Sequence, residues 1–172
     1  MKLATLSLLA PLAVLGASPI AAQEAQRPTY GSVGEATAPV ADAYFAAYIG
    51  RDWDALEPLL DEASSFEDPT ATYVFGGVKS DGRKAMMERF REGYAGITHM
   101  DFVKTRRMIS ADTAIYEGSL EWGLDLGSGT VVDSVTPMVI ILSVRDGKVV
   151  QHRDYVDYAP FIAALQAARA AK

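Results

Sequence analysis

The sequence predicts an α+β domain in which helices cover one face of a curved, mainly antiparallel sheet. In the first half of the chain, apolar residues recur at three- and four-residue spacing, as they do along one side of a helix. From about residue 101 onward the chain changes to runs rich in β-branched residues, separated by turns that contain glycine. Helices followed by consecutive strands are typical of α+β folds and not of alternating α/β folds.

Three helices are expected before the main strands. The first, at about 39–50, begins at a proline, which a first helical turn tolerates, and ends at a glycine. The second, at about 52–60, opens with an aspartate that can cap its free amides. An extended segment at 64–69 follows and ends in Asp-Pro, because the residue before proline disfavours helix. The third helix, capped by Ser80 or Asp81, runs to about residue 94.

Strands and a short terminal helix complete the expected fold. The strands are expected at 102–109, 113–126, 130–136, 138–144 and about 148–157, and the helix at 161–170. Pro137 separates two of these runs, and proline within a sheet favours an edge or a bulge. No internal repeat or second domain is evident.

The last two strands carry the most informative pattern. The Asp-Gly pair at 146–147 predicts a two-residue hairpin turn. Counting outwards from that turn places Ile141 opposite His152 and Val139 opposite Asp154, with all four side chains on one face. That face is apolar except for one imidazole and one carboxylate. The pair either lies at a solvated strand end or lines an apolar pocket, where a desolvated carboxylate suits proton transfer.

Composition excludes several functions. The chain has 172 residues and a formal charge of −6, which argues against nucleic-acid and anionic-membrane partners. It has no cysteine, so disulfides and thiolate sites are ruled out. Two histidines without an HExxH motif do not make an ordinary zinc site, and there is no glycine-rich phosphate loop. We therefore expect neither a metal nor a cofactor.

The N-terminus predicts export. Residues 1–22 combine a single lysine, a short apolar core and an Ala-Ala cleavage site, as in a signal peptide. The apolar run is short for a membrane span, although an uncleaved anchor is the alternative. We expect a signal peptide at 1–22, a flexible leader at 23–38 and one domain at 39–172. The mature protein would be periplasmic or secreted, without membrane insertion.

Three segments resemble the SnoaL-like branch of the nuclear transport factor 2-like superfamily. They are YFAAYIGRDWDALEPLL at 44–60, FEDP and GVKSDGRKAMMERF within 66–90, and DGKVVQHRDYVD at 146–157. The resemblance covers about 40–164 and implies a cone-shaped fold, with about three helices over a curved sheet around a pocket. Members include isomerases, epoxide hydrolases, polyketide cyclases, dehydratases and noncatalytic association domains, so the fold alone does not settle the activity.

The resemblance to ketosteroid isomerase implies roles for two residues. In that enzyme a tyrosine on the first helix donates to an oxyanion, and an aspartate in an EDP motif is the base. Tyr44 and Asp68 match these positions. A protonated aspartate on the penultimate strand completes the enzyme's oxyanion hole, but Ile140 stands at that place. The resemblance therefore lacks half of the oxyanion hole.

The resemblance to limonene epoxide hydrolase implies roles for further residues. The terminal strand of that enzyme resembles RDYVD, and the match makes Asp154 the residue that activates water or positions an acid. Glu121 and Asp68 would be its polar partners, but Ser119 replaces the arginine that bridges the two acids. Without that arginine, Asp154 and Glu121 would repel each other if both were ionised. Polyketide cyclases need only one acid in a hydrophobic pocket, a role open to Asp154 with His152 as relay.

These comparisons leave three hypotheses. The first is an enzyme that acts on a small hydrophobic molecule by acid/base chemistry, such as isomerisation, hydration, dehydration or cyclisation. The second is a noncatalytic binding protein, and the third is a homodimeric association domain. The catalytic candidates are Asp154, Asp68, Tyr44, His152 and Glu121. The candidates for the pocket wall are Phe66, Phe90, Val139 and Ile141. Each candidate also has a structural explanation as a turn, core or solvated surface residue.

Overall fold

A single curved sheet organises the molecule. The computed structural model describes residues 27–127 and 129–171, so the predicted signal peptide lies outside the described residues. In this part of the chain six strands form one sheet in the order β2-β1-β6-β5-β4-β3. The strands are β1 (Leu60–Asp68), β2 (Val78–Asp81), β3 (Ile97–Ser110), β4 (Thr113–Asp125), β5 (Val131–Arg145) and β6 (Lys148–Val156). All neighbouring pairs are antiparallel except β1 and β6, which are parallel. The predicted α+β class is confirmed.

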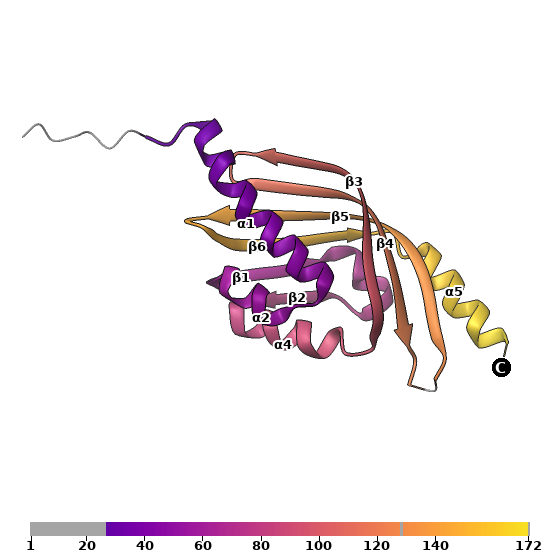
Figure 1. Cartoon of the computed structure of the whole chain (residues 1–172). Coiled ribbons are helices and arrows are strands. Elements are labelled where there is room, and N and C mark those ends of the chain that lie inside the picture. Colours follow the sequence, from indigo (N-terminus) through magenta and orange to yellow (C-terminus); the bar gives the residue numbers. More distant parts are fainter. Residues whose placement is uncertain (1–26, 128, 172) are drawn as a thin grey trace, which may run out of the picture.

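Helices cover one face of this sheet. They are α1 (Tyr30–Gly50), α2 (Trp53–Leu56), α3 (Thr72–Phe75), α4 (Arg83–Gly93) and α5 (Ala159–Ala170), with single 3₁₀ turns at Glu57–Leu59 and Pro69–Ala71. Figure 1 shows α1 crossing the sheet, α4 beside β1 and β2, and α5 at the opposite end beside β5. None of the helices in the described ranges has an apolar stretch long enough to cross a membrane.

The first helix begins earlier than the sequence suggested. Its N-cap is Thr29, whose side chain accepts a hydrogen bond from the Ser32 amide, and Ser32 returns the contact in a capping box. Pro39, expected at the first turn, instead lies inside the helix. The predicted flexible leader is therefore helical from Tyr30 onward, because the cap at Thr29 is the true start signal.

Of the predicted caps of the next two helices, one is confirmed and one is wrong. Asp52 caps α2 as expected, accepting from the Ala55 amide at 3.0 Å. The predicted cap of α4 is wrong, because Ser80 and Asp81 belong to β2 and pair with β1. The helix starts after Gly82, whose φ of 91° is readily adopted only by glycine.

Pro137 does not divide β5. It pairs with Ser119 of β4, and its carbonyl accepts a hydrogen bond from the Asp157 amide on the opposite side. The N–H and C=O of one strand residue point to the same side. The position where Pro137 lacks an N–H therefore faces the chain just beyond the end of β6 at Val156. A central strand can hold proline there because no ladder hydrogen bond is lost.

The hairpin between β5 and β6 forms with a different register from the one counted. Both turn residues have positive φ, 51° and 73°, as the Asp-Gly pair predicted. A bulge at Val150 then shifts the pairing, so that His152 lies opposite Leu142 and Asp154 opposite Ile140.

This shift moves two predicted wall residues. Val139 now pairs with Tyr155 and Ile141 with Arg153, so Val139 and Ile141 belong to the outer face of the sheet. His152 and Asp154 keep their place on the inner face, where both are buried. The error comes from one extra residue in β6, which the turn sequence does not reveal.

Candidate functional site

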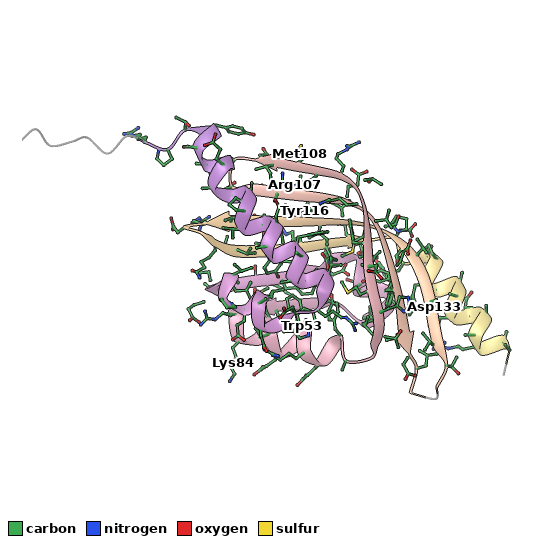
Figure 2. The ribbon with its side chains drawn as sticks, viewed as in Figure 1. Trp53, Lys84, Arg107, Met108, Tyr116 and Asp133 are labelled. Atoms are coloured by element: carbon green, nitrogen blue, oxygen red, sulfur yellow. The ribbon has the colours of Figure 1, made fainter. Side chains whose placement is uncertain are left out.

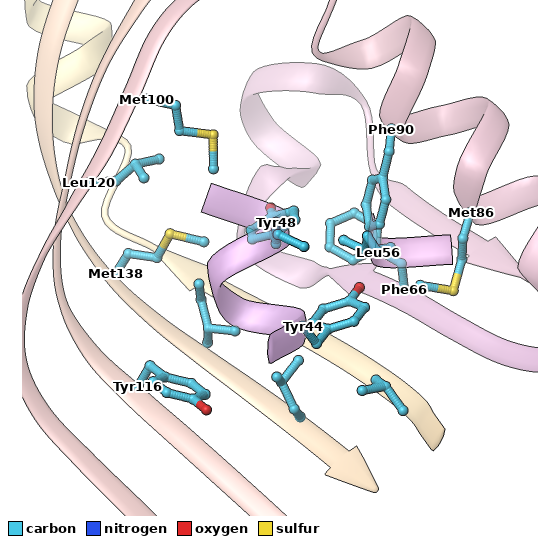
Figure 3. Packing of buried hydrophobic residues seen from close by; sticks show 14 of the residues in the cluster. Tyr44, Tyr48, Leu56, Phe66, Met86, Phe90, Met100, Tyr116, Leu120 and Met138 are labelled. Atoms are coloured by element: carbon cyan, nitrogen blue, oxygen red, sulfur yellow. The ribbon is translucent and has the colours of Figure 1, made fainter. Parts of the chain in front are cut away.

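A mainly apolar cavity lies between the inner face of the sheet and the helices. Its volume is about 240 Å³, and its walls include Met100, Leu120 and Met138 from three neighbouring strands. Figure 3 shows these three side chains extending towards Tyr48 of α1. Alternation along each strand places them inward. Trp122 continues the same wall of β4 and stacks on Phe161 of α5, with ring centroids 4.7 Å apart.

Asp154 is the acid at the centre of this site. It is 2% exposed and lines the cavity from β6. Its Oδ1 lies 2.7 Å from His152 Nε2, and its Oδ2 accepts a hydrogen bond from the Tyr48 hydroxyl at 2.9 Å. Both oxygens of a buried carboxylate are thus satisfied, as burial of a polar group requires.

His152 connects the acid to the first helix. Its Nδ1 lies 3.0 Å from the Tyr44 hydroxyl, and its ring is fully buried. The rings of Tyr48 and Phe66 meet the imidazole nearly edge-on, at centroid distances of 4.6 and 4.9 Å. The two-residue spacing of His152 and Asp154 puts both on one strand face, so the hydrogen bond between them follows directly from the strand period.

The hydroxyls of three tyrosines form the rest of the network. The Tyr48 hydroxyl also contacts the hydroxyl of Tyr94, which lines the cavity. Because Tyr48 gives its only proton to Asp154, Tyr94 is the donor in that contact. Burial raises the pKa of Tyr44, Tyr48 and Tyr94, and the nearby charge of Asp154 raises it further. These phenols therefore remain protonated donors.

Asp68 lies at the same cavity but is held differently. Its Oδ1 accepts hydrogen bonds from the amides of Thr70 and Ala71 and from the Thr70 hydroxyl. Asp68 thereby caps the following 3₁₀ turn. Its Oδ2 accepts from the Tyr158 hydroxyl at 2.6 Å, and burial together with this hydrogen bond to Asp68 raises the pKa of Tyr158. Four donors leave this carboxylate little capacity for a further partner.

The remaining predicted residues divide between cavity, core and outer surface. Phe66 lines the cavity, whereas Phe90 is buried behind it and packs on the Phe66 ring at 5.0 Å. Glu121 is exposed on the outer face of the sheet, where it lies opposite Asp101 of β3 in the strand register. The structure therefore does not bring Glu121 to Asp154. Its neighbours Leu120 and Trp122 point inward, as strand alternation dictates.

Sequence reasoning missed four polar residues at the site. Tyr48, Tyr94, Arg89 and Tyr158 all line the cavity. Tyr48 follows Tyr44 by four residues, so a shared helix face could have identified it. The other three come from α4, its C-terminal cap and the segment after β6, and no local pattern connects them. Across 27–127 and 129–171, no group of three or more acidic or histidine side chains is placed to hold a metal ion.

Comparisons with known proteins agree with this architecture. The family model described as SnoaL-like domain matches residues 41–152. A search of the curated proteins finds no match. A Shewanella denitrificans protein assigned as a SnoaL-like polyketide cyclase is similar in structure, with 19% identity, a TM-score of 0.68 and coverage of 76% of this chain and 97% of that one.

Two further solved structures share the fold. One is a hypothetical protein of Catenulispora acidiphila with a ketosteroid isomerase-like fold in complex with trimethylamine, at 20% identity and TM-score 0.61, covering 74% of this chain and 92% of that one. The other is an LEH-like epoxide hydrolase of M. tuberculosis, at 17% identity and TM-score 0.60, covering 84% and 96%. The family match spans most of the chain and includes every element from the middle of α1 to His152. The chain therefore belongs to the SnoaL-like domain family, within the nuclear transport factor 2-like superfamily.

Proposed function

We propose that the protein binds a small hydrophobic molecule in its cavity and moves a proton at Asp154 without a cofactor. One observation carries this proposal: a carboxylate that is 2% exposed borders an apolar cavity of about 240 Å³. Solved structures with the same fold include proteins assigned as a polyketide cyclase and an epoxide hydrolase, which supports small-molecule chemistry in general. The supported reaction class is proton transfer next to a carbonyl, or the addition or elimination of water.

The hydrogen bonds suit Asp154 better than Asp68 for this role. A carboxylate has about four lone-pair sites, and the partners of Asp154 occupy two of them. One of its oxygens can therefore accept a substrate proton while His152 and Tyr48 hold the group in place. Tyr94, whose hydroxyl contacts Tyr48 at the cavity wall, can turn its proton to a ligand oxygen and so stabilise developing negative charge.

A noncatalytic binding protein is the second candidate. The observation in its favour is that both oxygens of Asp154 and both ring nitrogens of His152 already have protein partners. Such a closed network can simply hold α1 against β6 and shape the cavity. In that case the ligand would be captured without being turned over.

Deuterium exchange separates the two candidates. Incubated in D₂O with a panel of small cyclic ketones, the wild type should accelerate exchange of the protons next to the carbonyl. Asp154→Asn keeps the shape but removes the base, so we expect the acceleration to fall by about 10²- to 10⁴-fold. A neutral naphthalene probe should still bind the variant. The exposed outer-face variant Glu121→Gln is the control, with unchanged exchange.

Each other outcome has a definite meaning. If the wild type binds the probe but does not accelerate exchange with any ketone, the binding-protein candidate replaces the enzyme. If Asp154→Asn exchanges as fast as the wild type, Asp154 is not the base. If no apolar probe binds the wild type, the cavity is not a ligand site and the proposal fails.

We also propose that the mature protein works outside the cytoplasm as a homodimer. The pattern of residues 1–22 supports export, and exposed apolar side chains on the outer sheet face support self-association. Mass spectrometry of the protein from a periplasmic extract should find Gln23 as the first residue. A full-length cytoplasmic form as the only product would contradict export.

A further inference from the structure

Arg89 is the unpaired cation of the cavity. It lies on α4 and lines the cavity, and its Nε donates to the Ser80 hydroxyl at 2.7 Å. Among the described residues, no carboxylate forms an ion pair with its guanidinium. Arg83 and Arg91 on the same helix differ, since they pair with Glu62 and with Asp54 and Glu57 respectively.

The acids that border the cavity have hydrogen-bond partners other than Arg89. Asp68 receives four hydrogen bonds from Thr70, Ala71 and Tyr158, and the oxygens of Asp154 face His152 and Tyr48. A guanidinium has five N–H donors in a planar fork, and the contact with Ser80 uses one of them. A half-buried cation with open donors beside an apolar cavity is suited to an anionic oxygen pair.

We propose that the ligand carries a carboxylate or another planar oxyanion, which Arg89 binds while the apolar body of the ligand fills the cavity. This inference rests on the proposed function, because it names the chemical class of the molecule bound at that site. The chain carries a formal charge of −6, so an anion would otherwise be disfavoured. Arg89 supplies the local positive charge that makes an anionic ligand acceptable.

The position of Tyr94 supports this orientation. Tyr94 lines the same cavity as Arg89 and Asp154, and its hydroxyl contacts Tyr48, which donates to Asp154. A ligand whose oxyanion meets Arg89 would therefore have its apolar body in the cavity that Tyr94 and Asp154 also line.

A matched pair of probes tests the inference. 2-Naphthoate and 2-naphthalenemethanol have similar shapes and differ in charge, and their dissociation constants can be measured by calorimetry. A charge-assisted hydrogen bond should make wild type bind the carboxylate about 10- to 100-fold more tightly than the alcohol. Arg89→Met should abolish this preference, and Arg89→Lys should keep part of it. Arg91→Met removes the same charge outside the cavity and should leave the preference unchanged.

The outcomes distinguish this inference from the function on which it rests. Equal binding of both probes by wild type would overturn the role of Arg89 and leave ligand binding intact. An unchanged preference in Arg89→Met would also overturn it. Binding of neither probe would refute both proposals. A thermal melt of each variant checks folding, and if Arg89→Met does not fold, the wild-type preference and Arg89→Lys decide.

Discussion

Two donor chains meet at the Asp154 carboxylate. On one side the Tyr44 hydroxyl contacts His152, whose Nε2 faces Oδ1, and on the other Tyr94 contacts Tyr48, which donates to Oδ2. With a neutral imidazole protonated at Nε2, every proton in the network points towards the carboxylate. Such a directed network fixes the acid in one orientation at the cavity wall, which both proton transfer and selective binding need.

Tyr48→Phe tests how much this network stabilises the fold. The substitution keeps the ring but leaves Asp154 Oδ2 and the Tyr94 hydroxyl without their partner. Leaving a buried polar group unsatisfied costs about 1–3 kcal/mol, so the free energy of unfolding in urea should fall by about that amount. Tyr73→Phe is the control, since that side chain is 96% exposed, and its effect should stay within about 0.5 kcal/mol. Equal stability of the two variants would show that the Tyr48 hydroxyl contributes nothing.

The raised pKa values of the buried tyrosines predict a dependence on alkaline pH. Burial and the charge of Asp154 raise the pKa of Tyr44, Tyr48 and Tyr94 in the folded state, whereas an unfolded tyrosine titrates near pH 10. Their contribution to stability is complete below about pH 10 and is lost as the pH rises further, because the unfolded chain then releases protons that the folded chain keeps.

Urea unfolding from pH 8 to 11 measures this loss. Each such group should steepen the fall in unfolding free energy by about 1.4 kcal/mol per pH unit above its unfolded pKa. Tyr48→Phe removes one group, so its slope should be shallower than that of the wild type by about this amount. Lysines titrate in the same range but are identical in both proteins. Parallel slopes would contradict a raised pKa for Tyr48.

At the scale of the elements, the contact between β3 and β4 depends on a residue without a side chain. An added Cβ at Gly118 would lie 2.2 Å from the Val103 carbonyl oxygen and 2.6 Å from the nearest Phe102 ring carbon. The ladder shifts register between Lys104 and Arg106, directly beside this position. Gly118 therefore lets the Phe102 ring lie across the strand at a bulge, as glycine often does in sheets.

Gly118→Ala should consequently be destabilising. Because backbone as well as a ring must shift, we expect a loss of about 1–3 kcal/mol of unfolding free energy in urea. Gly50→Ala is the matched control, since nothing lies within 4 Å of its added Cβ at the end of α1. That variant should be neutral or more stable by up to about 1 kcal/mol, because alanine favours helix. Equal effects of the two substitutions would contradict the close packing at Gly118.

The sequence could predict the elements better than their exact pairing. Alternation along β6 placed His152 and Asp154 on one face, and this holds whatever the partner strand does. Their partners depended on a bulge at Val150, and no residue pattern marks an extra residue in a strand. The same limit explains Val139, which local counting placed inward and the shifted register places outward.

Contacts between the polar residues of the site could be predicted only where both residues lie on one element. The His152–Asp154 pair lies on a single strand, so spacing alone brings it together. The contacts of Tyr48 with Asp154 and of Arg89 with Ser80 join residues from different elements, and they follow from how the helices lie on the curved sheet. The start of α1 at Tyr30 was missed for another reason, since Pro39 is the stronger local signal although Thr29 provides the cap.

At the scale of the whole molecule, the two faces of the sheet differ in what covers them. The inner face is covered by helices and contains the cavity, whereas large apolar side chains remain exposed on the outer face. Val103, Val135 and Tyr155 on β3, β5 and β6 are 52%, 55% and 40% exposed. Residues at these positions alternate with the inward-facing ones, so they form part of one outward surface. Exposed apolar patches of this kind favour association with another protein surface.

Self-association through this outer face is the last prediction. Wild type should be a dimer by light scattering coupled to size exclusion, because pairing two outer faces buries the same apolar side chains on both partners. Val135→Lys puts a charge at the most exposed of these positions and should shift the protein towards the monomer while leaving the thermal melt cooperative.

Lys84→Glu is the control for a change of charge at a surface position away from the outer sheet face. Figure 2 shows Lys84 on α4 pointing away from the molecule, and its side chain is 91% exposed. Its substitution should leave the dimer unchanged. A monomeric wild type would contradict the dimer, and a dimer that Val135→Lys leaves intact would place the interface elsewhere. Because the cavity lies on the inner side of the sheet, the Val135→Lys monomer should still bind the naphthalene probes, which would make ligand capture a property of one subunit.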